Sequence, residues 1–375
     1  MKIRIEVSSL ANKTLSGVGN YTRLLSEALD TSPKTSLHAS YFNFLSRQTT
    51  PILDIKQPLE KNSFVPLRVY AKLQSFNLAP AFDIFLKKVD LTILPNFATW
   101  PTLRSPLRAT VIHDLTYLRF PEAVEEKNLA HLRRVVPRSI KKADFIITVS
   151  ETVKNELIGE FGLDPDRCVV TTIPPDSSYS VKNNNEIHQK YGIPTKKYIF
   201  FIGNLEPRKD LPTLIRAYQK LPDAIKQEYS LVLAGGQGWK TAKSKAAIKR
   251  AQEDGDRVIH VGYVDQADAS AFYQRASLFV MPSLYEGFGM PVLEALSSKT
   301  PVVASDIPVL REAGGNAAIY AQPQNSDDFS RKILSTLTDN ELRAQLINNS
   351  IKHLEAFSWR KNADIILTKT KSLLS

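Results

Sequence analysis

The stretch PSLYEGFGMPVLEAL, residues 282–296, decides the fold and the chemistry that we expect of this chain. It follows the apolar run 278–281 and leads into an apolar helical segment, so it predicts a strand, a turn and a helix start. Two carboxylates, Glu286 and Glu294, stand with seven residues between them. A helix start offers backbone N–H groups and a positive dipole end to an anion, and carboxylates beside it accept hydrogen bonds from hydroxyls. The stretch therefore predicts a site for a sugar nucleotide; the plainer alternative is a loop whose glutamate caps a helix.

Similar strand-to-helix transitions recur along the whole chain. We expect strands at 2–6, 90–94, 109–113, 145–149 and 168–173, and a second series at 198–203, 230–234, 257–261, 278–281 and 301–304. Apolar strands that alternate with helices predict parallel sheets covered on both faces. The expected fold class is α/β, with two Rossmann-like, doubly wound parallel-sheet domains that face a cleft.

The polar, proline-containing stretch 174–197 separates the two series and is typical of a linker. A length of 375 residues also favours two domains. We place the first domain at residues 1–180 and the second at 181–356. Open parallel sheets bind ligands at the carboxyl ends of their strands, and every candidate motif below follows a strand.

Composition limits where the protein works and what it binds. Cys168 is the one cysteine, so no intrachain disulfide is possible, and the alternating N-terminus MKIRIEVSSL does not resemble a signal peptide. No segment approaches the roughly 20 apolar residues of a transmembrane helix. We expect a cytoplasmic protein. The net charge of +11 is spread over both halves and suits phosphorylated substrates or an anionic membrane face.

Two adjacent cations, Arg208 and Lys209, follow the expected strand 198–203 in GNLEPRKDLPTLIRAY, residues 203–218. Such a pair suits a diphosphate, because arginine is a planar fork and lysine a mobile point charge. In isolation the pair is more often solvated. Its position at a strand end, together with the opening stretch, favours the phosphate site.

Two further motifs belong to the first half. Gly17 and Gly19, in SGVGNYTRLL (16–25), let the backbone approach a ligand, although an ordinary turn has the same pattern. His113 ends a buried strand in VIHDLTY (111–117), where it is placed to bond a sugar hydroxyl or act as a base; a satisfied core histidine is the alternative.

No metal or other cofactor is expected. The segments 254–256 and 164–166 have the Asp-x-Asp pattern of metal ligands, but both lie in polar stretches near strand starts, and we interpret them as turns. The six histidines and one cysteine show no zinc spacing.

Taken together, these motifs resemble the family-4 (group 1) nucleotide-sugar glycosyltransferases of GT-B architecture, particularly bacterial mannosyl- and rhamnosyltransferase-like members. The matching segments span nearly the whole chain and include GNLEPRK (203–209), VGYV (261–264), EGFGMPVLEA (286–295) and FSW (357–359). The resemblance implies retention of anomeric configuration without a metal. It also implies that a last helix, 357–375, packs back on the first domain.

The resemblance also implies roles for single residues. It makes Glu286 and His113 contacts to the transferred sugar, Arg208 and Lys209 ligands of the diphosphate, and Glu294 a contact to ribose. The other donor-binding residues that we expect are Gly17, Gly19, Tyr263, Val264, Gly287, Phe288, Gly289, Met290 and Val292.

The expected function is transfer of a hexosyl unit, with mannosyl favoured, from a nucleoside diphosphate sugar to a hydroxyl of a glycan or lipid-linked acceptor in cell-surface glycan synthesis. Two alternatives stay open: a sugar-nucleotide epimerase of the same architecture, and a nucleotide-sugar-binding module without catalysis. No nucleic-acid motif is present.

Two basic, apolar stretches suggest peripheral attachment to an anionic membrane face. Residues 127–142 carry six cations and no acid, with Leu129, Leu132, Val136 and Ile140 as an apolar stripe; residues 64–76 are similar. An ordinary domain helix is the alternative for 127–142.

Overall fold

The computed structural model describes residues 1–11, 17–44, 49–181, 186–195 and 197–375. It divides into two compact units. The first contains Met1–Leu115, Glu126–Ile173 and Ser358–Ser375, and the second contains Thr116–Glu125 and Pro174–Phe357. The division therefore falls at 173/174 rather than at 180, and one short segment, Thr116–Glu125, belongs to the second unit. Phe120 of that segment packs against Tyr285 with ring centroids 5.8 Å apart.

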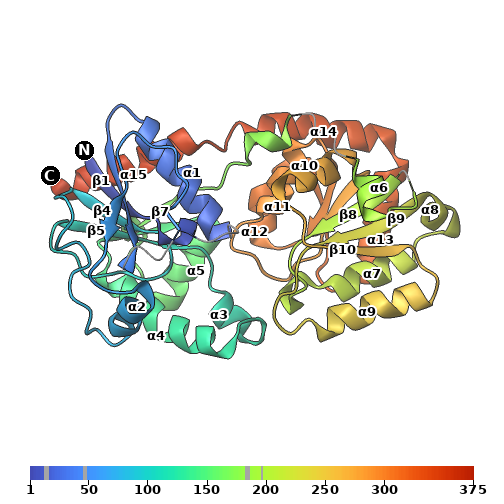
Figure 1. Ribbon diagram of the computed structural model, residues 1–375. Helices are drawn as coiled ribbons and strands as arrows, with labels where there is room; N and C mark the ends of the chain where they lie inside the picture. Colours follow the sequence, from blue (N-terminus) through green and yellow to red (C-terminus); the bar gives the residue numbers. More distant parts are fainter. Residues whose placement is uncertain (12–16, 45–48, 182–185, 196) are drawn as a thin grey trace. The chain divides into compact units, whose positions relative to one another are not determined.

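The first unit has a seven-stranded parallel sheet in the order β3-β2-β1-β4-β5-β6-β7. Its strands are β1 Lys2–Glu6, β2 Ser36–Phe42, β3 Glu60–Asn62, β4 Leu91–Leu94, β5 Leu107–Ile112, β6 Phe145–Thr148 and β7 Cys168–Val170. Its main helices are α1 Gly17–Thr31, α2 Leu67–Ser75, α4 Glu126–Lys142, α5 Glu151–Phe161 and α15 Trp359–Leu374. In Figure 1, α1 and α15 lie on one side of this sheet and α2, α4 and α5 on the other.

The last helix returns to the first unit. Trp359 of α15 packs against Tyr21 of α1 with ring centroids 5.7 Å apart. Asn362 donates a hydrogen bond to the carbonyl oxygen of Thr172, just after β7, at 2.6 Å. A buried apolar face, including Ile366 and Leu367, holds the helix in place.

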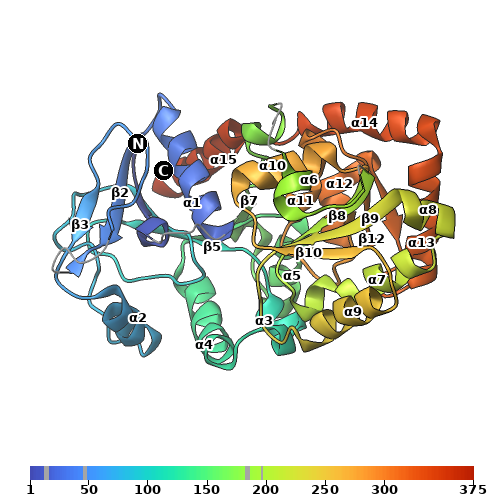
Figure 2. The ribbon, with the colours of Figure 1, turned by 45° about the vertical axis from the view of Figure 1, so that its right-hand side comes forward.

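The second unit has a six-stranded parallel sheet in the order β10-β9-β8-β11-β12-β13. Its strands are β8 Lys197–Ile202, β9 Tyr229–Ala234, β10 Val258–Gly262, β11 Leu278–Met281, β12 Val302–Ser305 and β13 Ala318–Ala321. Its helices are α3 Thr116–Arg119, α6 Ile187–Tyr191, α7 Leu211–Gln219, α8 Asp223–Glu228, α9 Ala242–Glu253, α10 Gln266–Arg275, α11 Met290–Ser297, α12 Pro308–Gly314, α13 Ser326–Thr338 and α14 Asn340–Leu354. Figures 1 and 2 show α7 and α9 on one face of this sheet.

Both predicted series of strands are present, and the α/β class with two parallel-sheet domains is confirmed. Three strands were not predicted: β2, β3 and β13. Polar residues interrupt the apolar run of β2, SLHASYF, and β3 is a three-residue polar edge strand, EKN. The expected linker is also wrong in part, because 187–191 forms α6 with Ile187 buried.

Strand order determines where the functional loops meet. In the second sheet the chain runs outward from β8 through β9 to β10 and then crosses back to β11 on the other side of β8. Such a reversal leaves a crevice at the carboxyl ends of the two central strands. The loops after β8 and β11 therefore lie side by side. The first sheet has its own reversal between β1 and β4.

Candidate functional site

The loops after β8 and β11 bring Arg208, Lys209 and Glu286 into one buried ion cluster. Arg208 Nη1 lies 2.7 Å from Glu286 Oε2, and Lys209 Nζ lies 2.5 Å from Glu286 Oε1. The carboxylate is thus bound through both oxygens by two cations from another loop. The exposed fractions of the Lys209 and Glu286 side chains are 8% and 9%, so little water shields the pairs.

The cluster fixes the charge on Glu286. Burial by itself raises the pKa of this carboxyl, but the positive charges of Arg208 and Lys209 outweigh burial and lower the pKa to about 2. Burial lowers the pKa of Lys209, and the charge of Glu286 opposes that change. Glu286 is therefore an ionised carboxylate at neutral pH, able to accept hydrogen bonds but not to donate a proton.

A second carboxylate, Glu206, belongs to the same cluster and was missed by the sequence analysis. Its Oε2 accepts a hydrogen bond from Arg208 Nε at 3.0 Å. The carbonyl oxygen of Tyr285 accepts another from Arg208 Nη1 at 3.1 Å. Arg208 is consequently held by both loops. The only sequence signal for Glu206 is its place two residues before Arg208, which is common in solvated turns.

The start of α11 adjoins this cluster. Gly289 precedes the helix with a φ of 119°, a backbone conformation that favours glycine. A Cβ at Gly289 would lie 2.9 Å from Leu310 Cδ2 and 3.1 Å from Ala313 Cβ, so the turn packs tightly against α12. The N–H of Val292 donates to the carbonyl oxygen of Gly289 at 2.9 Å. Because Val292 is already engaged, the expected phosphate contact of this turn depends on Gly289 and Met290. Pro291, which has no N–H to donate, is the second residue of the helix.

Glu294 lies one turn into α11. Its Oε2 accepts a hydrogen bond from the hydroxyl of Tyr273 at 2.8 Å, and Tyr179 is a second partner. Burial raises the pKa of Glu294 to about 7, although both tyrosine hydroxyls act in the opposite direction. The two glutamates of the opening stretch therefore differ in charge behaviour: one stays ionised and the other titrates near neutral pH.

This difference predicts a pH effect on stability. Between about pH 4.5 and 7 the folded chain keeps a proton on Glu294 that the unfolded chain releases, so the free energy of unfolding falls as pH rises through that window. We expect Glu294→Gln to make this fall smaller by about 2 kcal/mol. Urea unfolding at the two ends of the window, for wild type and variant, measures the difference. An equal pH dependence in both proteins would contradict the raised pKa.

The remaining donor-binding candidates of the second unit occupy different environments. Tyr263 and Val264 follow β10, with Tyr263 exposed and Val264 buried. Gly287 stands in the loop of the ion cluster. Phe288 is buried, and its ring packs against Phe357 with centroids 6.0 Å apart. The side chain of Phe288 therefore supports the loop, and its backbone remains the part available to a donor.

His113 is buried at the end of β5 in the first unit. Its Nε2 bonds the carbonyl oxygen of Pro95 at 2.8 Å, which makes Nε2 the protonated nitrogen of a neutral ring. Tyr21 and Phe97 pack edge-on against the ring, with centroids 5.1 and 5.7 Å away. Burial lowers the pKa of His113. A fixed neutral ring suits a hydrogen-bonding contact better than a proton carrier.

Gly17 is exposed at the start of α1, and Gly19 is buried two residues later. Ser16, the first residue of the predicted glycine motif, lies outside the described residues. A Cβ at Gly17 would meet no atom within 4 Å, so this position is open.

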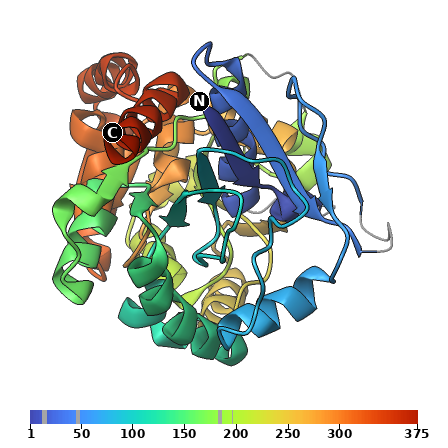
Figure 3. The ribbon, with the colours of Figure 1, turned by 90° about the vertical axis from the view of Figure 1, so that its left-hand side faces the viewer.

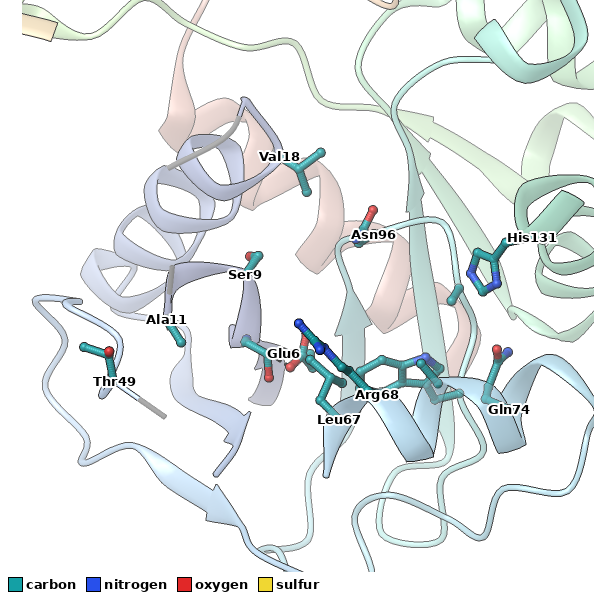
Figure 4. Close-up of a pocket in the computed structure, with 14 residues that line it drawn as sticks. Glu6, Ser9, Ala11, Val18, Thr49, Leu67, Arg68, Gln74, Asn96 and His131 are labelled. Atoms are coloured by element: carbon teal, nitrogen blue, oxygen red, sulfur yellow. Dashed lines mark hydrogen bonds between the residues drawn. The ribbon is translucent and has the colours of Figure 1, made fainter. Parts of the chain in front are cut away.

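A pocket of about 630 Å³ opens in the first unit beside the reversal between β1 and β4. Figure 4 shows Glu6, the last residue of β1, near its centre, with Arg68 of α2 close by and Gln74 and His131 at one end. Glu6 is buried, and burial raises the pKa of its carboxyl to about 7. Its Oε1 accepts a hydrogen bond from the N–H of Ser8 at 2.9 Å. The sequence analysis missed this pocket because its residues come from separate elements.

Of the two Asp-x-Asp segments, 254–256 forms the predicted turn, whereas 164–166 begins a short 3-10 helix. Asp164 caps a short helix by accepting a hydrogen bond from the N–H of Asp166. Asp254 is the C-cap residue after α9, and Gly255 follows with a φ of 85°. Among the described residues, no group of three or more histidine, cysteine or acidic side chains is arranged to hold a metal ion.

Comparison with known proteins gives consistent results for both halves. Residues 183–353 match the family model described as glycosyl transferases group 1. The chain is 34% identical over 268 residues to the O-antigen chain mannosyltransferase B of Escherichia coli, which covers 71% of this chain and 70% of that protein. It is 27% identical over 300 residues to the O-antigen chain mannosyltransferase RfbU of Salmonella typhimurium, covering 80% and 79% of the two chains. The crystal structure of Anabaena Alr3699/HepE with UDP and glucose matches with a TM-score of 0.69 at 16% identity, over 99% of this chain and 100% of that one.

Proposed function

Because this chain belongs to the group 1 glycosyltransferases and has the GT-B architecture, we propose that it transfers a mannosyl-like hexosyl unit from a nucleoside diphosphate sugar to a glycan hydroxyl. The observation that carries the proposal is the buried cluster in which Arg208 and Lys209 hold Glu286. Two cations and an ionised carboxylate lie together where the strand order of the sheet reverses. The cations suit the diphosphate of such a donor, and the carboxylate suits the hydroxyls of its sugar. The mannosyl preference rests on the names of the two bacterial relatives.

The cluster has a defined part to play in the reaction. The bond between the anomeric carbon and the diphosphate oxygen breaks, and its electron pair stays on the diphosphate. Arg208 and Lys209 stabilise that developing charge, which is the largest contribution a preorganised site makes. Glu286 accepts hydrogen bonds from hydroxyls of the transferred sugar and, with its low pKa, remains ionised throughout.

We propose that residues of α11 contact the ribose and the phosphates of the donor. Glu294 accepts hydrogen bonds from ribose hydroxyls, and the backbone at Gly289 and Met290 donates to phosphate at the start of α11. We propose that the acceptor oxygen attacks from the face that the diphosphate leaves, so anomeric configuration is retained. The acceptor proton passes to the leaving phosphate oxygen, and no separate protein base is required. The two cations supply the charge that a metal ion provides elsewhere, which supports metal-independent transfer.

A screen of UDP-, GDP- and dTDP-sugars for donor consumption, with and without a chelator, tests this proposal. We expect one donor to be consumed with release of nucleoside diphosphate, and the chelator to have no effect. Recovery of an epimerised nucleotide sugar would favour the epimerase, and tight binding without turnover would favour the binding module. The bound UDP and glucose of the Anabaena structure make UDP-sugars a necessary part of the screen.

The acceptor is proposed to bind the pocket around Glu6 in the first unit. A buried carboxylate beside Arg68 and Gln74 offers an acceptor and donors to sugar hydroxyls, and Trp100 adds an aromatic surface. We expect Glu6→Gln to raise the KM for acceptor about tenfold, because the amide replaces one of the two carboxyl oxygens by an NH₂ group that cannot accept a hydrogen bond. Donor hydrolysis without acceptor is the control and should be unchanged. An unchanged acceptor KM would exclude this pocket as the acceptor site.

The same proposal includes peripheral attachment to an anionic membrane face, where a lipid-linked acceptor would be available. Among the described residues, none of the helices combines the length and the apolar composition needed to cross a membrane.

A further inference from the structure

Helix α2 has two distinct faces. Leu67, Ala71 and Gln74 line the pocket around Glu6. Val69 and Phe76, seven residues apart, lie on the opposite side of the helix, because successive residues turn by about 100°. Both are exposed. An exposed apolar helix face requires a separate explanation.

Further exposed apolar side chains lie before and after α2 in the chain. Phe64, before α2, packs against Phe85 with ring centroids 6.1 Å apart, and Leu78 follows the helix. We define the α2 surface by five residues: Phe64, Val69, Phe76, Leu78 and Phe85. Their exposed fractions range from 37% to 79%. Three of the five are aromatic, which is the residue type enriched where a protein enters a membrane interface.

The charge around the α2 surface has one sign. Residues 61–89 contain five cations, Lys61, Arg68, Lys72, Lys87 and Lys88, and one acid, Asp83. Asp83 is fully buried, where it pairs with Arg4 at 3.4 Å and accepts hydrogen bonds from the N–H groups of Leu103 and Arg104. The segment therefore presents only positive charge to solvent.

Helix α4 adds cations to the same edge. Figures 2 and 3 show α2 and α4 along one edge of the first unit. Arg134 lies over the ring of Phe76 at 5.0 Å, Arg138 Nη1 donates to the carbonyl oxygen of Ser75 at 2.6 Å, and Lys142 Nζ donates to Asn77 Oδ1 at 2.7 Å. The two helices thus form one continuous basic and aromatic area.

The structure also separates the two membrane candidates of the sequence. Of the predicted stripe on α4, Val136 and Ile140 are buried in the domain, whereas Leu129 and Leu132 are half-buried. The alternative of an ordinary domain helix therefore holds for Val136 and Ile140. Most of the exposed residues of α4 are cations, and the apolar contact must come from α2.

We propose that the α2 surface docks on an anionic lipid bilayer, with its aromatic rings at the level of the headgroups and the surrounding lysines and arginines on anionic lipid. Charge complementarity selects this partner: each cation near an anionic bilayer contributes favourably, and apolar burial adds to it. The inference deepens the proposed function and rests on it in one respect: a lipid-linked acceptor is the reason for the enzyme to dock on a membrane. The surface itself is independent of the donor cluster.

Flotation with phosphatidylcholine vesicles, with and without phosphatidylglycerol, tests the proposal. The wild type is expected to float with the anionic vesicles only. The triple variant Val69→Ser/Phe76→Ser/Leu78→Ser is expected to bind roughly tenfold more weakly, and Lys72→Glu/Lys142→Glu at least as weakly. The matched control is Trp239→Ser/Lys243→Glu/Lys245→Glu, which removes exposed residues of the same kinds at and before α9 and should bind like wild type.

Three results would overturn the proposal: no binding of wild type to anionic vesicles, loss of binding in the α9 variant with the α2 variants unaffected, or a lipid-free self-association that only the α2 variants abolish. The last result would assign the surface to a protein interface. Donor hydrolysis without lipid is measured for every variant. It reports on folding and keeps failure of membrane docking distinct from failure of the proposed transferase activity.

Discussion

Lys209→Met is expected to lower donor turnover about a thousandfold, the upper range for removing one group that stabilises transition-state charge. Methionine keeps much of the length of the side chain in its buried site but cannot bond Glu286 Oε1, which now lies 2.5 Å from Lys209 Nζ. Glu286 then has one cation instead of two, and its pKa rises from about 2 because burial is less opposed. Turnover at saturating donor measures the loss.

Lys220→Met is the matched control. Lys220 is also in the second unit and also pairs with a carboxylate, Asp327 at 2.8 Å, but that pair is exposed. An exposed ion pair contributes little to stability. The Lys220–Asp327 pair is not part of the ion cluster, so it does not stabilise charge there. We expect near-wild-type turnover. A folded Lys209→Met protein that retained turnover within a few-fold of wild type would place the donor chemistry elsewhere.

The ion cluster shows how far sequence reasoning extends. Each of its three predicted members follows a strand, and the rule for parallel sheets places all of them at carboxyl ends. Their contact across 77 residues also requires β8 and β11 to be neighbours. Strand order results from packing of whole elements, and the local pattern of either segment does not contain it. Glu206 was missed for the same reason, because its place in the cluster depends on the orientation of the Arg208 side chain.

The burial of individual side chains is the second property that the sequence pattern did not predict. The periodicity of residues 127–142 shows an apolar stripe correctly, but it does not show whether that stripe meets the domain or a membrane. The structure buries Val136 and Ile140 and exposes Phe76 and Phe85 instead. Phe85 lies in none of the predicted helices or strands, so its exposure could be found only from the folded structure. His113 is similar: the strand end was predicted, whereas its packing between Tyr21 and Phe97 was not.

Gly235→Ala is expected to destabilise the second unit by about 4 kcal/mol or more, which is the range for severe single-site effects. A Cβ at Gly235 would lie 2.0 Å from the carbonyl oxygen of Gly203, and backbone cannot move aside as a flexible side chain does. Its φ of 135° adds strain for any residue with a Cβ. We expect the melting temperature to fall by about 10 °C or more.

Gly236→Ala is the control for this prediction. A Cβ there would have one neighbour within 4 Å, Asn204 Oδ1 at 3.8 Å, and the backbone is not in the left-handed region. The variant should melt within a few degrees of wild type. Equal losses in the two variants would show that the region tolerates no side chain at all, and would contradict a specific contact with Gly203.

The same substitution should affect turnover in whatever protein remains folded. Gly203 is hydrogen-bonded to β9 through its N–H, which donates to the carbonyl oxygen of Ala234 at 3.0 Å, and it begins the loop that carries Arg208 and Lys209. Displacing Gly203 moves both cations relative to Glu286, and ion pairs of 2.5–2.7 Å do not survive a shift of an ångström. Turnover below the melting transition should therefore fall in Gly235→Ala and not in Gly236→Ala. The charged side chains perform the proposed chemistry, and the glycine backbone beneath them determines whether they meet.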